Sequence, residues 1–293
     1  MLTPVFLLVL LGYVVGPKLK LEARTLSRFA YFILIPAFVF DVLSKAKIEL
    51  SMALQIAAYS SMVHLACAAL GYGCAKILRR PPQMVAAYML IAIFGNVGNF
   101  GLPIIKFRFP DQPLVLEMST VYFLTIMTVS FVIGVAAATW NTGGRLRAAI
   151  AVIKTPAILA VPPALLANAL QLQMPLVFAR PIELLAAAMI PTMVVALGVQ
   201  LAGAGLPRIS LDMILASAIR LIAGPLLALA LAAPFGVAGL ERSVGVIQSA
   251  MPTAVLASII AFENDLIPEF VITTVLFSTL ASVVTLTIVL ALV

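Results

Sequence analysis

Long apolar runs, separated by short polar segments, cover almost the whole chain. Each run has about 20 residues, the length of α-helix that crosses a bilayer core roughly 30 Å thick. The pattern therefore predicts an all-α integral membrane protein with about ten transmembrane helices. The expected spans are Leu2–Gly16, Leu26–Leu43, Met52–Leu78, Val85–Ile105, Leu114–Ala138, Ala149–Leu170, Ile182–Leu201, Ile214–Phe235, Ser243–Phe262 and Phe270–Val293.

The composition excludes a water-soluble globular protein. Hydrophobic residues make up 63% of the chain and charged residues 10%, and the mean hydropathy is +1.19. The net charge is +7, and most of the charged residues lie between the apolar runs. This distribution indicates a protein in a lipid bilayer and no nucleic-acid partner. Cys67 and Cys74 would lie about 10 Å apart on one helix, too far for a disulfide. With His64 as the only histidine, the sequence supports neither a metal site nor a cofactor.

The basic residues predict how the spans are oriented. Cytoplasmic loops of membrane proteins carry an excess of Lys and Arg. If both termini lie outside, the inner loops hold eleven basic residues and the outer loops six, so we expect an N-out, C-out protein in a bacterial inner membrane. The first span shows no cleavage motif, and we expect it to be retained. The inner set is Lys18, Lys20, Arg24, Arg28, Lys76, Arg79, Arg80, Arg145, Arg147, Lys154 and Arg208.

The two halves of the chain resemble each other at an offset of 155 residues. Ile35-Pro36 in the second span matches Ile190-Pro191 in the seventh. Because each half has five spans, an odd number, the second half enters the membrane from the opposite face and the repeat is inverted. Inverted repeats are typical of secondary transporters. We expect one repeat at residues 1–138, an inter-repeat loop at 139–148 and the second repeat at 149–293.

Two spans at corresponding places in the repeats carry residues that break helices. The fourth has three glycines, two asparagines and a proline between Gly95 and Pro103, and the ninth contains Met251-Pro252-Thr253. Glycine and proline destabilise a helix interior by about 1 and 3 kcal/mol, so neither segment should remain helical. Paired broken spans are the best sequence indication of a transporter's binding site. The candidate substrate-binding residues are Asn96, Gly98, Asn99, Gly101, Pro103, Met251, Pro252 and Thr253.

Other polar residues inside the spans are candidates for coupling or charge pairing. Arg220 either pairs with a carboxylate of substrate or protein, or extends to the inner interface. His64 relays protons or is satisfied by a backbone carbonyl, and Asp41 is interfacial or neutralises a basic group. Gln248 contacts substrate or a neighbouring helix.

One further pattern concerns helix packing. Gly12 and Gly16, four residues apart, form a small-residue packing face or a contact in a homodimer.

The segments Gly95–Pro103 and Ala250–Val255 resemble the two crossover segments of the auxin efflux carrier family, which includes plant exporters and bacterial malate or malonate carriers. The resemblance extends over the whole chain. It implies a fold related to bile-acid and sodium-proton transporters, in which spans one, two, six and seven form a scaffold. Spans three to five and eight to ten would then carry a carboxylate by an elevator-type motion. One position departs from the family pattern, because leucine stands at 256 where the pattern has asparagine.

The function expected from these observations is secondary transport of a small organic anion, with the site between the broken fourth and ninth spans. A proton- or sodium-coupled carrier of the same fold is the alternative. A membrane-embedded enzyme would need converging nucleophile, base or metal ligands, and a channel would need rings of charge or a filter loop. The sequence offers none of these, so we expect no catalytic residues.

Overall fold

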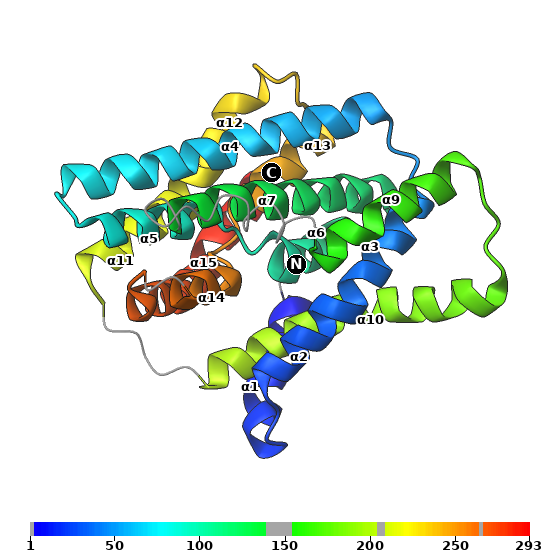
Figure 1. The fold of residues 1–293 in the computed structure, drawn as a ribbon, viewed down its shortest axis with the longest axis horizontal. Helices are drawn as coiled ribbons and strands as arrows, with labels where there is room; N and C mark the ends of the chain where they lie inside the picture. The colour runs from blue at the N-terminus through cyan, green and yellow to red at the C-terminus, as the bar shows by residue number, and fades with distance from the viewer. Residues whose placement is uncertain (1–2, 139–153, 204–208, 264–265) are drawn as a thin grey trace. The chain divides into compact units, whose positions relative to one another are not determined.

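The structure, a computed structural model, describes residues 3–138, 154–203, 209–263 and 266–293, and most of these residues are helical (Figure 1). Three short segments, η1 to η3, are π-helices. The elements are α1 Thr3–Lys18, α2 Ala23–Phe29, η1 Ala30–Leu34, α3 Ile35–Ser44, α4 Leu50–Ile77, α5 Pro82–Ile93, η2 Val97–Gly101, α6 Leu102–Arg108, α7 Pro113–Ala138, α9 Pro156–Ala169, α10 Leu176–Gly203, α11 Leu211–Ala218, η3 Ile219–Ala223, α12 Gly224–Ala232, α13 Gly239–Ser249, α14 Val255–Glu263 and α15 Pro268–Leu292.

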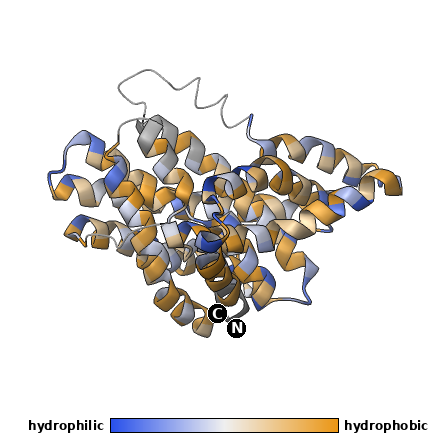
Figure 2. Ribbon diagram, turned by 90° about the horizontal axis from the view of Figure 1, so that it is seen from below, coloured by the Kyte–Doolittle hydropathy of each residue, from blue (hydrophilic) through white to orange (hydrophobic). Residues whose placement is uncertain are grey.

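Six of the described helical segments are long and apolar enough to cross a membrane. They are Ala23–Ser44, Leu50–Ile77, Pro113–Ser130, Leu176–Gly203, Leu211–Ala232 and Pro268–Leu292. Apolar side chains also point outward from them, for example Ile77 and Leu184, which are 83% and 72% exposed. Hydrophobic residues occupy most of the length of the helices in Figure 2, and hydrophilic ones gather near turns. Such a surface requires a lipid environment, so the chain is an integral membrane protein.

The other predicted spans are helices that are shorter or interrupted. α1 and α9 are short, and the fourth and ninth runs are each divided into two helices, α5 with α6 and α13 with α14. The first residues of the sixth run and the predicted loop 139–148 lie outside the described residues.

The helices group into two compact units. Unit 1 comprises Met1–Glu49, Gly98–Thr120 and Ile153–Gly205, and therefore holds α1 to α3, α6, α9 and α10. Unit 2 comprises Leu50–Val97, Val121–Val152 and Leu206–Val293, and holds α4, α5, most of α7 and α11 to α15.

Helices α1 and α10 of unit 1 approach each other closely through glycines (Figure 1). A Cβ atom on Gly198 would lie 2.0 Å from the carbonyl oxygen of Val9, and one on Gly12 would lie 2.1 Å from that of Val195. No side chain fits at these distances. The packing face predicted at Gly12 and Gly16 is therefore used inside the chain, against α10, and this surface is not available for a dimer contact.

Two polar side chains, which no sequence pattern singles out, hold the connection after α3 in unit 1. The buried carboxylate of Glu117 accepts hydrogen bonds from the backbone N–H groups of Lys47 and Ile48, both at 2.8 Å. The Asn168 amide donates to the carbonyl oxygens of Ser44 and Ala46. The turn's backbone groups thus have partners without forming helix.

A second anchor, in unit 2, ties the α4–α5 turn to the start of α11. The Asp212 carboxylate accepts hydrogen bonds from Arg80 Nε at 2.9 Å and from the Tyr88 hydroxyl at 2.8 Å. Asp212 lies in the first turn of α11, where the positive end of the helix dipole also favours a carboxylate.

Each π-helix is followed directly by a helix that has a proline in its first turn: Pro36 in α3, Pro103 in α6 and Pro225 in α12. Proline has no N–H and its ring displaces the carbonyl four residues earlier, so a wider turn before it relieves the clash. In the first turn of a helix an N–H group has no intrahelical acceptor, so proline's lack of an N–H costs little there. The expectation that all of Gly95–Pro103 leaves the helix is therefore wrong in part, because the helix resumes before Pro103.

Candidate functional site

The two interrupted runs cross each other within unit 2. Residues Phe94–Asn96 and Ala250–Ala254 are not helical, and Gly95 and Thr253 form an isolated antiparallel β-bridge. The N–H of Asn96 donates to the carbonyl oxygen of Pro252, and the N–H of Ala254 to that of Phe94, both at 2.7 Å. We call this pair of extended segments the crossover. It brings together residues that are about 155 positions apart in the sequence.

Carbonyl groups at the end of α5 have no intrahelical donor. Their donors come from the crossover, from η3 and from α7. Unpaired carbonyls at membrane depth are costly, so these hydrogen bonds make the interruption tolerable. The pairs are Ile91 O with Thr253 Oγ1 (3.1 Å), Ala92 O with Arg220 Nη1 (3.3 Å), Ile93 O with Ser130 Oγ (3.0 Å) and Phe94 O with Ala254 N (2.7 Å).

Arg220, from η3, joins the ends of both interrupted helices. Besides Ala92 of α5, its guanidinium donates to Met251 O through Nε at 2.8 Å and to Gln248 O through Nη2 at 3.3 Å, at the end of α13. The C-termini of α5 and α13 are the negative ends of their dipoles, so the cation is stabilised by both. A planar fork of donors suits this task better than a single ammonium group.

The burial of Arg220 contradicts one of the two interpretations of the sequence. Its side chain is completely buried, so the expectation that it extends to the interface is wrong. Within the described residues no carboxylate lies at salt-bridge distance from it; the acceptors that its hydrogen bonds reach are backbone carbonyls.

Two glycines allow this arrangement. A Cβ atom on Gly95 would lie 2.3 Å from Arg220 Nη2, and three hydrogen bonds prevent the guanidinium from moving away. A Cβ atom on Gly224 would lie 2.5 Å from the carbonyl oxygen of Ser249. Both positions therefore require the absence of a side chain, because the backbone or a fixed guanidinium occupies the space.

The candidate binding residues are divided between the two units. Asn96, Met251, Pro252 and Thr253 are buried members of the crossover in unit 2. Thr253 is itself held, since its N–H donates to Ser278 Oγ at 3.2 Å. Gly98, Asn99, Gly101 and Pro103 follow in η2 and α6, in the part of the chain assigned to unit 1, where Asn99 is half-buried and the others are buried.

Two further candidates, His64 and Gln248, are buried in unit 2. His64 of α4 is fully buried, with Nδ1 3.0 Å from the Ser60 carbonyl oxygen and its ring against Tyr122. Gln248 is buried at the end of α13, where its backbone carbonyl receives the Arg220 hydrogen bond.

Asp41 lies far from these groups in the sequence, near the end of α3 in unit 1. Its carboxylate pairs with Lys45 at 2.6 Å, and Lys45 also contacts Glu183 at 2.8 Å. Burial acts to lower the pKa of Lys45, but its hydrogen bonds and charge interactions with the two carboxylates outweigh this and raise the pKa.

Sequence reasoning missed the hydroxyl groups that support the crossover. Ser278 hydrogen-bonds its backbone, Ser130 bonds Ile93 O at the adjacent end of α5, and Tyr122 hydrogen-bonds the Ser249 side chain at 2.5 Å. Serines are common in membrane helices and usually bond within their own helix, so no local signal separates these from the rest.

Two comparisons with known proteins bear on the family of the chain. The sequence model of a family described as membrane transport protein matches residues 1–290. A protein of Methanothermobacter thermautotrophicus, named an uncharacterized transporter, is 27% identical over 287 residues, which cover 96% of this chain and 94% of that protein. Because the family match extends over nearly the whole sequence, the chain belongs to this family of membrane transport proteins, the auxin efflux carriers.

Proposed function

We propose that this transporter carries a small organic carboxylate, which binds beside the crossover of unit 2. The observation that carries the proposal is the hydrogen bonding of Arg220 to the C-terminal ends of α5 and α13. The guanidinium satisfies the negative ends of the interrupted helices. Helix α14 begins at Val255, directly after the crossover, and the first N–H groups of a helix lack intrahelical acceptors. The N–H groups at the start of α14, together with the Asn96 amide, suit a carboxylate as ligand.

The family's inverted-repeat fold would explain why the two interruptions meet. We infer ten spans in two repeats, residues 1–138 and 149–293, with both termini outside a bacterial inner membrane. Support comes from the ten apolar runs, the Ile-Pro match at an offset of 155 and the crossing of the two broken segments.

The transport step that we propose is an elevator motion in which unit 2 moves relative to a scaffold. Spans one, two, six and seven fall in unit 1, and the third, eighth, ninth and tenth in unit 2. Residues 98–120 group with unit 1, so in this proposal the second part of span four and the start of span five would belong to the scaffold. Because hydrogen bonds join the crossover to η3 and α15, and the adjacent end of α5 to α7, unit 2 would move as one body.

Two kinds of carrier can be compared, one with a coupling sodium ion at the crossover and one without a coupling cation there. The geometry favours the second. A sodium ion there would require oxygen ligands. The carbonyl oxygens at the ends of α5 and α13 already accept hydrogen bonds from Arg220, which supplies the positive charge itself. A homodimer remains a proposal, and its contact would lie away from Gly12 and Gly16.

Ligand-dependent thermal unfolding of the purified protein tests this function. We expect malate, malonate or indole acetate to raise the melting temperature, because a ligand at about 100 times its Kd stabilises the native state by about 2.7 kcal/mol. The Asn96→Ala, Asn99→Ala double variant should lose both the shift and transport into proteoliposomes while remaining folded.

The matched control is Gln112→Ala, which removes an exposed amide side chain outside the crossover. It should retain the shift. Full transport by the double variant would contradict the placement of the site, and no shift with any anion would contradict the substrate class.

A further inference from the structure

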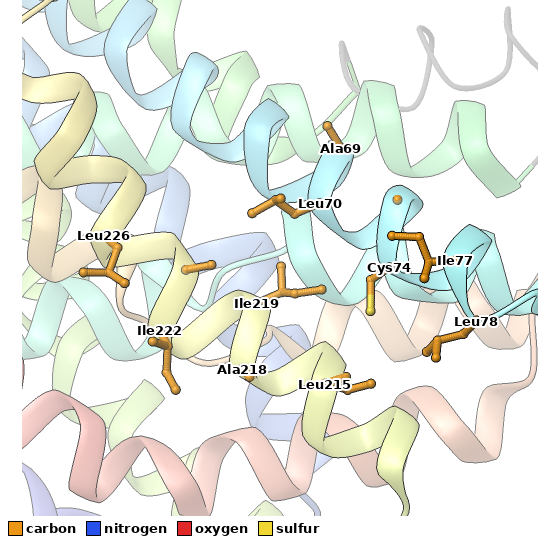
Figure 3. A pocket seen from close by; sticks show the side chains of 12 residues that line it. Ala69, Leu70, Cys74, Ile77, Leu78, Leu215, Ala218, Ile219, Ile222 and Leu226 are labelled. Atoms are coloured by element: carbon orange, nitrogen blue, oxygen red, sulfur yellow. The ribbon is translucent and has the colours of Figure 1, made fainter.

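An apolar groove of about 540 Å³ lies in unit 2, between α4 on one side and α11, η3 and α12 on the other (Figure 3). Figure 3 shows Cys74 extending from α4 toward the side on which Leu215 and Ile219 lie. The lining consists of hydrophobic side chains, the Cys74 thiol and Gly73. The groove is separate from the crossover, although Ile219 and Ile222, which line it, belong to the same short π-helix as Arg220.

The shape of the groove suits an alkyl chain. Its α4 wall extends from Ala69 to Leu78, about 13 Å at helical rise, and its other wall from Leu215 to Leu226, about 16 Å. Both walls belong to membrane-spanning segments, so the medium that meets the groove is lipid. An empty apolar groove would forfeit dispersion contacts along its whole lining, and an acyl chain supplies them.

Basic residues at one end of the groove indicate that the lipid there has an anionic headgroup. Ile77 and Leu78 line the groove, and the adjacent residues Lys76 and Arg79 are both exposed. Arg80 is paired with Asp212, and Lys76 Nζ lies 5.6 Å from the centre of the Tyr72 ring. Among the described residues, no carboxylate pairs with Lys76 or Arg79, so both exposed cations can take an external anion. Basic residues next to a span attract anionic headgroups by about 1 kcal/mol each. We propose that the groove holds one acyl chain of an anionic phospholipid whose phosphate lies against Lys76 and Arg79.

Such a lipid would pack against the face of η3 that lines the groove, next to Arg220, which bonds the crossover. Ile219 and Ile222 face the groove, whereas Arg220 between them is completely buried and bonded to α5 and α13. A chain packed on the outer side of η3 therefore fills space directly behind the residue that joins the interrupted helices. This inference does not depend on the identity of the transported substrate.

Glycine substitutions provide a direct test of the groove. Gly73 lines the groove, and a Cβ atom there meets nothing within 4 Å, so we expect Gly73→Phe to place its ring in the groove. Gly203, near the end of α10 in unit 1, is equally open, and Gly203→Phe is the matched control. The measurement is native mass spectrometry of protein from nanodiscs made with equal amounts of dioleoyl phosphatidylglycerol and dioleoyl phosphatidylcholine.

We expect the wild type and Gly203→Phe to retain phosphatidylglycerol, and Gly73→Phe to lose it. The Lys76→Gln, Arg79→Gln variant changes only exposed side chains, so it tests the headgroup even if Gly73→Phe folds poorly. Its preference for phosphatidylglycerol should fall about fivefold for each basic residue removed. Equal retention of the two lipids by the wild type, or undiminished retention of phosphatidylglycerol by folded Gly73→Phe, would overturn the proposal.

Cysteine labelling gives an independent measurement. Cys74 lines the groove and is half-buried, whereas Cys67 is completely buried. An apolar maleimide should modify Cys74 more slowly in phosphatidylglycerol nanodiscs than in phosphatidylcholine nanodiscs. The difference should disappear in the Lys76→Gln, Arg79→Gln variant, and an unchanged difference there would contradict the headgroup assignment.

Discussion

Arg220→Met is expected to abolish transport and to destabilise unit 2. The substitution keeps the apolar volume but leaves the carbonyls of Ala92, Gln248 and Met251 without the guanidinium. Each buried group that loses its partner costs about 1–3 kcal/mol. Gln248 O keeps the Met251 N–H at 3.3 Å as a donor, so the larger losses are expected at Ala92 and Met251. These carbonyls belong to the backbone, so they cannot be removed as the second member of a buried pair can.

Transport into proteoliposomes and the melting temperature are the two measurements. Arg220→Lys should be intermediate, because it keeps the charge but cannot match the geometry of three carbonyls. The control Arg242→Met removes an exposed arginine of α13 and should change neither value. An Arg220→Met protein with normal stability and transport would show that the crossover does not depend on this residue.

Gly198→Val is expected to lower the stability of unit 1 by about 3 kcal/mol, the upper end for overpacking. The new Cβ atom would lie 2.0 Å from Val9 O and 2.8 Å from Tyr13 N. Both are backbone atoms of α1, so the helices can accommodate it only by moving apart. Gly203→Val, in the same helix, meets nothing within 4 Å and is the matched control.

Thermal melting of the two purified valine variants measures the difference. Gly12→Val should behave like Gly198→Val, since it clashes with the same helix pair from the other side. Equal melting temperatures for Gly198→Val and Gly203→Val would show that α1 and α10 do not approach each other as described.

The helical runs and their interruptions could be predicted from the sequence because they depend on local properties. Length and hydropathy indicate spans, and glycine and proline weaken the helix at the position where they occur. The segments containing Gly95 and Pro252 leave the helix in the structure for this reason. The resumption of helix before Pro103 was not predicted, because proline in a first turn and proline in a break look alike in sequence.

The partners of Arg220 and Glu117 could not be predicted. A sequence search for the partner of a buried charge looks for the opposite charge, whereas these residues bond backbone groups. Every residue has a carbonyl, and every residue except proline has an N–H, so no residue type marks which ones a distant side chain will reach. Only the helix ends, where such groups lack intrahelical partners, narrow the choice.

Arg220 also determines how the proposed motion would respond to a membrane potential. Within the described residues no carboxylate pairs with it, so unit 2 carries a buried positive charge at the crossover. A charge that crosses the membrane field changes in energy by about 2.3 kcal/mol per 100 mV. With a monoanion bound the unit would be neutral at this site and cross without work against the field. The empty unit would cross as a cation, and a bound dianion would make it an anion.

Voltage should therefore act on the return of the empty carrier when a monocarboxylate is transported, and on the loaded step as well when a dicarboxylate is. Initial rates in proteoliposomes under imposed potassium diffusion potentials would distinguish the two cases, and rates independent of potential for both substrates would exclude movement of this charge. Under the proposed function, the electrical behaviour of the transport cycle would therefore depend on the charge of the substrate.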